Sequence, residues 1–344
     1  MVVIGGGISG VACARRLHAA GLPVRLLERG HRLGGRMASR TEQVNGRTHP
    51  VDIGAPYFTV RESRFADVVT ALEAAGLARK WTDTFTLAGP NGRTGETAGP
   101  QRWSSTRGLR ALVEALATDG SARDGSALDI RLETEVTRVE YDSTTGAAMV
   151  DGEPAAAVVL AMPDPQAARL LPSDLADQFG VSGRDYAPVL AVWAGWPDRW
   201  WPAFDGIFVA DSEVLSWVAD SGRSRGDAAD VLVAHTTPGF AAAYLRGLAD
   251  PVSAIQPVFT ELRRVIGAPV PPPEWERVHR WSLASSRQPH AEPFLLADSP
   301  VGGASPGLIG ICGDAWGPRS RVEQAWSSGD GLAGELIKRL TVSF

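Results

Sequence analysis

The first thirty residues carry apolar and polar side chains in the order expected of a strand, a helix and a second strand. Residues 2–4 and 24–27 are short apolar runs, and residues 11–20 repeat apolar side chains at helical spacing. A glycine-rich stretch, residues 5–10, separates the first strand from the helix, and Gly21 ends the helix. The pattern therefore predicts a β-α-β unit at the start of the chain.

The same reading applies to the rest of the chain. It predicts helices over 63–79, 107–117, 239–247, 251–266 and 322–340. It predicts strands over 128–141, 147–150, 156–161, 188–194, 206–210, 214–218, 231–236 and 308–312, with irregular strands over 81–103. Because the C-terminal part repeats the strand, turn and helix of the N-terminal part, both ends are expected to build one nucleotide-binding domain.

The glycine stretch matches a dinucleotide-binding fingerprint in its predicted context. Gly5 makes the tight turn, Gly7 lets a pyrophosphate approach the helix N-terminus, and Gly10 allows the helix and strand to pack closely. Glu28 ends the second strand, where its carboxylate can accept hydrogen bonds from ribose hydroxyls. A structural glycine turn is the alternative, but it does not require all of these parts together.

Gly34-Gly35-Arg36 follows shortly after Glu28. Two residues without side chains beside an arginine fit a second contact with the diphosphate, because a guanidinium offers a fork of donors to phosphate oxygens. A surface turn with a solvated arginine is the alternative, and the neighbouring fingerprint favours the phosphate interpretation.

With these motifs, residues 2–36 resemble the N-terminus of the flavoprotein superfamily that contains amine oxidases and aromatic hydroxylases. Two further segments resemble the renalases and their bacterial relatives: residues 52–59, Asp-Ile-Gly-Ala-Pro-Tyr-Phe-Thr, and Gly313-Asp314 followed by residues 321–329. Residues 158–163 resemble the middle flavin strand of that group, and His235 and residues 279–281 resemble it more loosely. The resemblance covers both ends of the chain well and the middle weakly.

The resemblance implies FAD as the cofactor and an α/β fold, with a Rossmann-type FAD-binding domain and an inserted antiparallel-sheet substrate domain. The FAD-binding domain is expected to comprise residues 1–70, 101–163 and 286–344, and the substrate domain residues 71–100 and 164–285. Ser9 and Arg36 would contact the phosphates, and residues 54–57 would pass beside the isoalloxazine ring. Val136 would offer backbone groups to the adenine end, and Asp314 would bind the ribitol or pyrophosphate region. The helix starting near Val322 would direct its N-terminus at the flavin carbonyl edge. The full set of expected FAD contacts is Gly5, Gly7, Ser9, Gly10, Glu28, Arg29, Gly35, Arg36, Met37, Gly54, Ala55, Pro56, Tyr57, Val136, Gly313, Asp314, Arg321, Val322 and Ala325.

The chain departs from the renalase pattern where substrate would bind. Pro56 replaces a glutamine, which removes an amide and stiffens the loop, and Ser282-Leu283 replace an Arg-Tyr pair. The candidate catalytic residues are Tyr57, His235 and Trp281, although His235 fits a satisfied core histidine equally well. The expected activity is transfer of a hydride from a small planar or cyclic substrate of the dihydronicotinamide type to FAD, with O2 as the electron acceptor and H2O2 as the product.

Composition narrows the chemistry further. The 344 residues carry a formal net charge of −5 and no apolar run long enough to cross a membrane, so we expect neither nucleic-acid nor membrane binding. Two cysteines, Cys13 and Cys312, indicate a cytoplasmic protein without disulfides. Cys312 directly precedes Gly313, whereas the amine oxidases that tether FAD through a cysteine carry it well before that motif, so we expect non-covalent FAD. No metal site is expected, and the oligomeric state stays open.

Only two lysines occur, Lys80 and Lys338, and neither lies in a segment matching the lysine that many amine oxidases place near the flavin. This counts against ordinary amine oxidation. Two alternatives remain open: an oxidase or desaturase of an amine or secondary metabolite, and a non-enzymic protein that retains the fold as a binding scaffold.

Overall fold

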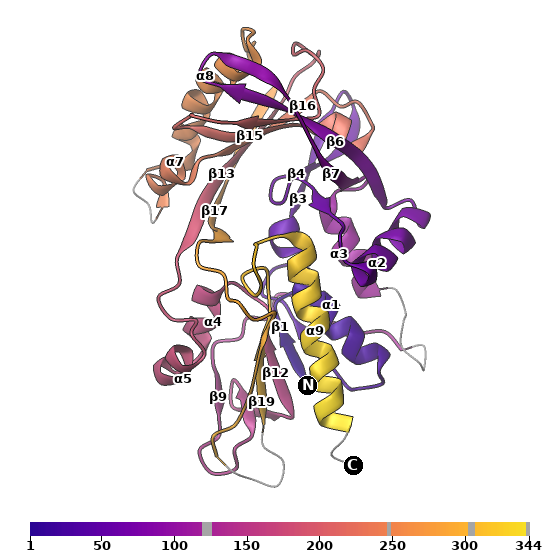
Figure 1. The fold of residues 1–344 in the computed structure, drawn as a ribbon, viewed down its shortest axis with the longest axis vertical. Coiled ribbons are helices and arrows are strands. Elements are labelled where there is room, and N and C mark those ends of the chain that lie inside the picture. Colours follow the sequence, from indigo (N-terminus) through magenta and orange to yellow (C-terminus); the bar gives the residue numbers. More distant parts are fainter. Residues whose placement is uncertain (119–125, 246–248, 302–306, 342–344) are drawn as a thin grey trace. The chain divides into compact units, whose positions relative to one another are not determined.

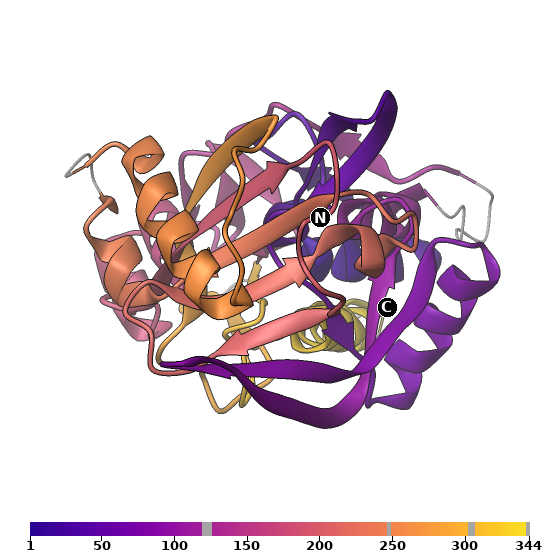
Figure 2. The same ribbon diagram turned by 90° about the horizontal axis from the view of Figure 1, so that it is seen from above.

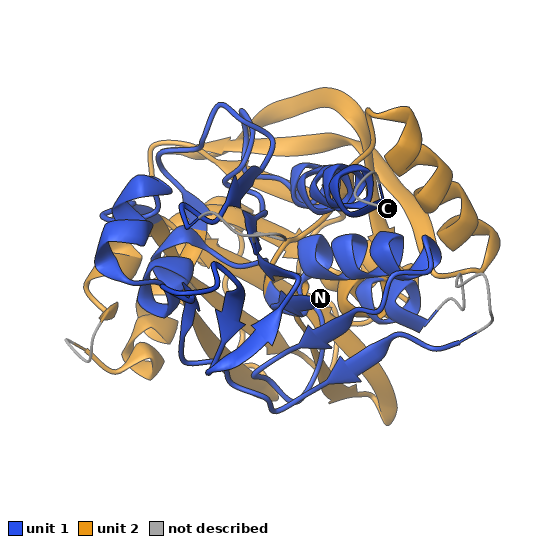
Figure 3. Ribbon diagram, turned by 90° about the horizontal axis from the view of Figure 1, so that it is seen from below, with its two compact units in different colours: residues 1–35, 113–186, 285–344 blue, residues 36–112, 187–284 orange. Residues whose placement is uncertain are grey.

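The structure is a computed structural model that describes residues 1–118, 126–245, 249–301 and 307–341. Figure 1 gives the element labels. The chain divides into two compact units, coloured separately in Figure 3. Unit 1 comprises residues 1–35, 113–186 and 285–344, and unit 2 comprises residues 36–112 and 187–284. Both units therefore combine segments that lie far apart in the sequence.

Unit 1 is built on a six-stranded sheet in the order β18-β19-β12-β1-β2-β8. Its strands are β1 (Val2–Ile4), β2 (Arg25–Leu27), β8 (Asp129–Arg131), β12 (Ala157–Leu160), β18 (Leu295–Asp298) and β19 (Leu308–Ile311). Neighbouring strands from β8 to β19 pair in parallel, and β18 is antiparallel to β19. The order places β1 centrally, as in a Rossmann-type sheet.

Helices α1 (Ile8–Ala19) and α9 (Val322–Thr341) pack against each other within unit 1. A Cβ at Gly329 would lie 2.0 Å from the carbonyl oxygen of Ser9, so glycine permits this close approach. Arg16 of α1 forms a 2.7 Å ion pair with Asp330 of α9. Unit 1 also contains α4 (Asp164–Leu170), α5 (Ser173–Gln178) and the small sheet of β9 (Val139–Tyr141), β10 (Ala148–Val150) and β11 (Glu153–Ala155).

Unit 2 is built on an eight-stranded sheet in the order β17-β13-β16-β15-β14-β6-β7-β5. Its strands are β5 (Phe58–Thr59), β6 (Ala78–Gly89), β7 (Gly92–Ser105), β13 (Tyr186–Gly195), β14 (Gly206–Val209), β15 (Leu215–Asp220), β16 (Val231–Thr236) and β17 (Trp275–Ser286). The hairpin of β3 (Ser39–Val44) and β4 (Arg47–Asp52) forms a separate two-stranded sheet. The remaining elements are η1 (Gly35–Met37), α2 (Ser63–Ala74), α6 (Ser221–Arg225), α7 (Pro238–Ala242), η3 (Pro251–Ala254) and α8 (Ile255–Ile266). Helix α3 (Leu109–Thr118) begins in unit 2 and belongs to unit 1 from Val113 onward.

The two faces of this sheet bury different residues because side chains alternate along each strand. Val192 and Leu232 point to one face, where they pack with Val258 and Leu262 of α8. Figure 2 shows α8 lying over the sheet. The opposite face includes Trp193, which packs with residues of the β3–β4 hairpin. Helix α8 thus covers one face, and the other face is left for the hairpin and the aromatic residues described below.

The predicted α/β class, with a Rossmann-type domain and further antiparallel sheet, is confirmed, but several element boundaries are wrong. The helix predicted over 63–79 ends at Ala74, where Gly76 takes a φ of +70°, and residues 78–79 begin β6. The strand predicted over 128–141 is two strands, β8 and β9, separated by Glu133 with a φ of +52°. Residues 81–103 belong to one long paired hairpin, β6 and β7, rather than to irregular strands.

Other elements were extended, shortened or absent from the prediction. The helix predicted over 251–266 begins with the 3₁₀ turn η3, and α7 ends at Ala242, whereas the predicted helix extended to 247, into residues outside the described part. Strands β3, β4, β17 and β18 and helices α4, α5 and α6 were not predicted. The compact units group residues 36–70 and 101–112 with the eight-stranded sheet and residues 164–186 with the six-stranded sheet. The predicted division into FAD-binding and substrate domains stays a prediction.

Candidate functional site

The glycine turn between β1 and α1 in unit 1 has the close contacts that its motif predicts. Gly5 has a φ of +110°, and a Cβ there would lie 2.4 Å from the carbonyl oxygen of Ala161. A Cβ at Gly10 would lie 1.9 Å from the carbonyl oxygen of Gly5. A Cβ at Gly7, by contrast, would meet nothing within 4 Å. Gly5 and Gly10 are therefore required by the protein's own backbone, and Gly7 leaves open space at the helix N-terminus.

Glu28 is held by this turn. One carboxylate oxygen accepts the backbone N–H of Gly6 at 2.7 Å, and the other accepts the backbone N–H of Gly30 at 2.7 Å. A carboxylate oxygen can accept more than one hydrogen bond, so both oxygens retain capacity for a ribose hydroxyl. Arg29 is exposed beside it.

The second glycine pair packs directly on the first turn. Gly34 donates its backbone N–H to the carbonyl oxygen of Gly6 at 2.9 Å. Gly35 has a φ of +51°, and a Cβ there would lie 3.3 Å from the Cα of Gly7. The structure thus brings the two glycine motifs of unit 1 together around Gly7. The neighbouring Arg36, in unit 2, donates from Nη1 to the carbonyl oxygen of Ala284 at 3.2 Å, and Met37 is buried.

The C-terminal motif of unit 1 connects β19 to α9. Gly313 donates its backbone N–H to Ser328 Oγ at 3.1 Å, and the buried carboxylate of Asp314 accepts a hydrogen bond from the hydroxyl of Ser320. Arg321 accepts the backbone N–H of Ala325 at 3.0 Å, directly before Val322 begins the helix. Val136, in the loop between β8 and β9, is also buried.

Both cysteines are buried and unbonded in unit 1. Burial raises the pKa of the Cys312 thiol to about 12 and raises the pKa of Cys13 as well. Both thiols therefore stay protonated near neutral pH, and protonated thiols are poor nucleophiles. This supports the expected absence of a cysteinyl bond to FAD, which stays a prediction.

In unit 2, the segment that follows β4 has a tightly determined backbone. Ala55 donates its N–H to the carbonyl oxygen of Arg36 at 2.9 Å, and a Cβ at Gly54 would lie 1.9 Å from that same oxygen. Trp281 Nε1 donates to the carbonyl oxygen of Ile53 at 2.7 Å. The segment from Ile53 to Tyr57 is hereafter called the β4–β5 segment. Position 54 must therefore be glycine, because any side chain there would collide with the carbonyl oxygen of Arg36.

Tyr57 begins an aromatic cluster on the sheet face opposite α8. The cluster comprises Tyr57, Trp81, Phe85, Phe208 and Trp217. The ring of Phe85 lies 4.7 Å from Trp217 and 5.3 Å from Tyr57, measured between centroids, with steeply inclined planes. The guanidinium of the buried Arg102 lies 4.3 Å from the Phe85 centroid. Such a cluster suits contact with a planar or cyclic apolar group.

His235 and Trp217 are register partners on β16 and β15, so their side chains leave the same face of the sheet. Trp217 Nε1 and His235 Nε2 are both buried and have no hydrogen-bond partner among the described residues. Burial lowers the pKa of His235 to about 4, although a hydrogen bond with the Ile53 backbone opposes this shift. His235 is therefore a neutral imidazole near pH 7. Its Nε2 lacks a hydrogen-bond partner among the described residues, whereas a histidine with a purely structural role in the core would have its ring nitrogens hydrogen-bonded.

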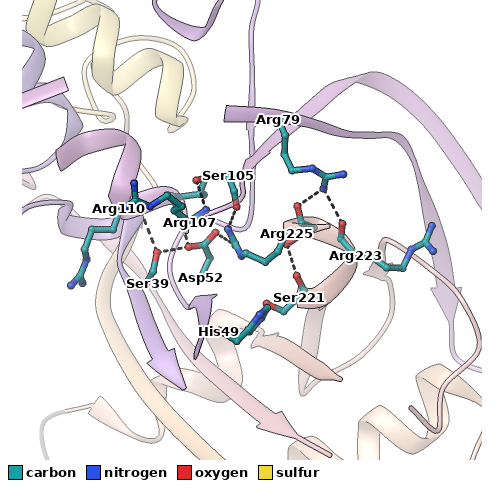
Figure 4. Close-up of polar contacts among 12 residues, drawn as sticks. Ser39, His49, Asp52, Arg79, Ser105, Arg107, Arg110, Ser221, Arg223 and Arg225 are labelled. Carbon is teal, nitrogen blue, oxygen red and sulfur yellow. Dashed lines mark hydrogen bonds and ion pairs between the residues drawn. The ribbon is translucent and has the colours of Figure 1, made fainter. Parts of the chain in front are cut away.

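A buried polar network surrounds Asp52, the residue before the β4–β5 segment (Figure 4). One carboxylate oxygen accepts the Ser39 hydroxyl at 2.5 Å and the backbone N–H of Leu109 at 2.9 Å. The other oxygen is paired with Arg225 of α6. His49 lies beside this network, with Nε2 3.0 Å from Ser221 Oγ. Sequence reasoning missed Arg225 and His49 because nothing in the local pattern links residues so distant in sequence.

Unit 1 contains a second buried polar group that the sequence did not reveal. His290 Nε2 lies 3.0 Å from Asp164 Oδ2, and Arg184 Nη2 lies 3.3 Å from His290 Nδ1. The imidazole stacks on Trp316, with centroids 3.7 Å apart and planes 3° apart. Trp316 lies two residues after Asp314, so this stack supports the loop that carries the C-terminal motif.

The comparisons with known proteins agree with this geometry. A model of an NAD(P)-binding Rossmann-like domain matches residues 3–72, and a model described as flavin containing amine oxidoreductase matches residues 79–337. The chain belongs to the flavin-containing amine oxidoreductase family. It is accordingly an FAD-dependent oxidoreductase, and the non-enzymic alternative is set aside. The predicted cofactor is confirmed, while the narrower renalase resemblance is not decided by this match.

A curated relative is similar over part of the chain. The (S)-6-hydroxynicotine oxidase of Paenarthrobacter nicotinovorans is 36% identical over 129 residues, which is 38% of this chain and 29% of that oxidase. The match therefore spans less than a third of the relative's length.

Solved structures show the same fold along the whole chain. The cyclohexylamine oxidase of Brevibacterium oxydans IH-35A superposes with a TM-score of 0.72 at 15% identity, covering 99% of both chains. A putrescine oxidase with putrescine bound gives a TM-score of 0.69 at 16% identity, covering 98% of both. At these identities the likeness concerns the fold alone.

The residues of this family member fit the dinucleotide part of FAD. The open space at Gly7 and the N-terminus of α1, which has no side-chain cap, can receive the pyrophosphate. Glu28 is fixed by Gly6 and Gly30 in an orientation suited to a ribose. The individual FAD contacts named from the sequence, including those of Arg29, Met37, Pro56, Val136 and Arg321, stay predictions.

Neither lysine of this family member belongs to the aromatic cluster. Lys80 is the register partner of Trp103, and its Nζ lies 5.6 Å from that indole ring. Lys338 lies on α9, where its side chain is exposed and 3.3 Å from Glu335. The described residues contain no helix long and apolar enough to cross a membrane.

Proposed function

We propose that this oxidoreductase takes a hydride from a small nitrogen-containing ring of the dihydronicotinamide type and passes the electrons to O2. The carrying observation is the character of the aromatic cluster and its neighbour His235. The cluster offers apolar ring surface, and His235, the register partner of Trp217, adds a weakly basic, neutral imidazole. A dihydropyridine suits this environment because it releases hydride without first losing a proton.

The atoms balance with O2 as the final acceptor. The substrate loses one hydride, and O2 takes up that hydride and a proton to give H2O2. When bound, FAD supplies the two-electron chemistry that connects these steps. The chain's own contribution is to orient the ring and exclude water. Tyr57 and Trp217 would contact the ring, Trp281 would hold the β4–β5 segment through the Ile53 carbonyl, and His235 Nε2 would meet a polar substituent.

Anaerobic mixing tests the proposal. The purified flavoprotein is mixed with dihydronicotinamide isomers, and loss of the flavin absorption at about 450 nm is followed. We expect at least one isomer to bleach the band and air to restore it with one H2O2 per substrate. An oxidised nicotinamide, which has no hydride to give, is the control. If no dihydronicotinamide bleaches the flavin, the substrate assignment is wrong.

A second candidate function is the oxidation of a cyclic or secondary amine. It is favoured by the family membership and by the 36% identical segment shared with a hydroxynicotine oxidase. The positions of Lys80 and Lys338, outside the aromatic cluster, weigh against the lysine-dependent form of this chemistry. Presenting hydroxypyridyl-substituted and simple cyclic amines in the same anaerobic assay separates the two functions, because each predicts a different compound that bleaches the flavin.

A further inference from the structure

We propose that Asp52 and Arg225 are positioning residues for the β4–β5 segment, and that this buried pair sets the flavin environment of the enzyme. The inference rests on the predicted placement of that segment at the flavin, and it does not depend on which substrate is oxidised. Asp52 is 5% exposed and Arg225 is 2% exposed, so both groups are withdrawn from water.

The carboxylate of Asp52 binds groups from three elements: β3, the first turn of α3 and α6. Ser39 holds it from β3, the backbone N–H of Leu109 holds it from the first turn of α3, and Arg225 holds it from α6. The next residue, Ile53, donates its N–H to the carbonyl oxygen of Ala38 at 3.1 Å. The carboxylate therefore determines where the chain leaves β4 and enters the β4–β5 segment.

Arg225 is itself held in place from several directions. It donates to the carbonyl oxygen of Ser105, as well as to Asp52. Helix α6 ends after it, where Gly226 takes a φ of +79°. His49 secures both ends of this short helix, since Nε2 lies 3.0 Å from Ser221 Oγ and Nδ1 lies 2.6 Å from Asp227. Figure 4 shows Ser39 and Arg225 pointing toward Asp52, while His49 lies beside Ser221.

The backbone of the β4–β5 segment has little room to move. Gly54 lies so close to the carbonyl oxygen of Arg36 that no Cβ fits, and the carbonyl oxygen of Ile53 accepts Trp281 Nε1. His235 also interacts with the Ile53 backbone. A shift of the residue that begins the segment would therefore alter the orientation of Trp281, His235 and Tyr57 together.

A matched pair in the same unit provides the control. Asp220 is 0% exposed and accepts from Arg199, from Trp201 Nε1 at 2.9 Å and from the backbone N–H of Arg223 at 2.9 Å. It begins the same helix α6 that Arg225 ends. The two carboxylates have the same chemistry and comparable burial, although Arg199 is 30% exposed and Arg225 is buried. The hydrogen-bond partners of Asp220 named above lie outside β4. A purely structural role predicts similar consequences for the two pairs.

The experiment compares the double variants Asp52→Asn/Arg225→Leu and Asp220→Asn/Arg199→Leu as FAD-loaded proteins. Removing both partners of a buried pair avoids leaving either of them as an uncompensated buried charge. Arg199 also lies 3.3 Å from Asp230, but that carboxylate is 17% exposed and can be solvated, so both variants are expected to fold. The visible circular dichroism of the bound flavin and its dissociation constant are measured beside the melting temperature. If the double variant of Asp52 does not fold, Arg225→Lys, which retains the charge but not the forked geometry, takes its place.

We expect the Asp52/Arg225 variant to change the visible circular dichroism band and to bind FAD about tenfold or more weakly, as displacement by roughly 1 Å can cost 100-fold in function. The Asp220/Arg199 variant is expected to keep the wild-type band and an FAD affinity within about twofold, on the same reasoning. A wild-type flavin spectrum in the Asp52/Arg225 variant, or equal spectral changes in both variants, would overturn the inference. Failure of every substrate in the anaerobic assay would leave this spectral comparison unaffected.

Discussion

The neutral state of His235 predicts a pH-dependent contribution to stability that can be isolated by mutation. Burial lowers its pKa from 6.5 to about 4 in the folded protein. Between these values the unfolded chain binds a proton that the native protein does not, so the free energy of unfolding must fall as the pH decreases from 6.5 to 4 and level off below that. One pKa unit corresponds to about 1.4 kcal/mol, which gives a total of about 3 kcal/mol.

The measurement compares the wild-type protein with His235→Gln at a fixed excess of FAD. Urea denaturation is followed by tryptophan fluorescence at several pH values between 4 and 7.5, a convenient signal in a chain with 11 tryptophans. Other groups titrate equally in both proteins, so the difference between the two unfolding free energies reports His235. His31→Gln, which removes an exposed imidazole, controls for the loss of a histidine.

The expected result is that the stability of the wild type relative to His235→Gln declines by about 3 kcal/mol between pH 7.5 and pH 4. A difference that stays constant to within about 0.5 kcal/mol over this range, close to the error of such comparisons, would refute the reasoning. It would mean that the imidazole is solvated in the native protein, and the proposed meeting of Nε2 with a substrate substituent would lose its physical basis.

Three further substitutions test individual features. Gly54→Ala places a methyl group 1.9 Å from a backbone carbonyl oxygen and should destabilise the protein by about 1–3 kcal/mol in urea denaturation, whereas Gly239→Ala, where a Cβ meets nothing within 4 Å, should not; equal effects would contradict the close-approach argument. Glu28→Gln leaves one of two backbone N–H groups facing an amide nitrogen, and fluorescence titration should show FAD binding weakened about tenfold or more, with unchanged affinity as the opposing result. Lys80→Met should leave the anaerobic rate of flavin reduction within about twofold, since its ammonium contacts Trp103; a loss of about 100-fold would instead indicate lysine-assisted amine oxidation.

The elements that were predicted best are those that form because of residues close together in the sequence. The β1–α1–β2 unit follows from apolar periodicity and from glycines that the adjacent backbone requires, so a few residues suffice to recognise it. Strands such as β16 were found because an apolar run buried on both faces of a sheet is distinctive. The C-terminal strand β19 was found for the same reason.

The elements that the sequence missed depend on partners far along the chain. Strand β17, Trp275–Ser286, mixes tryptophan with arginine, histidine and serine, and it is a strand because it pairs with β13. The stack of His290 on Trp316 joins two loops, and neither residue has a local pattern that predicts the other. Arg225 resembles any surface arginine in sequence, yet it is paired with a carboxylate 173 residues away. Burial of a charge is a property of the assembled fold, and hydrophobic periodicity does not encode it.

The Asp-x-Gly stretch at residues 52–54 shows how one motif can have two physical causes. The resemblance to the renalases placed Gly54 among the expected FAD contacts and gave the aspartate no role of its own. In the structure, the glycine is required by the carbonyl oxygen of Arg36, and the aspartate joins β3, α3 and α6 at the start of the segment. Both residues therefore fix the course of the backbone. Any contact with a bound ring would come from the side chains that follow them. Because the segment is held at Asp52 and Gly54, its course does not require the glutamine that the renalase resemblance leads one to expect at position 56, where this chain has proline.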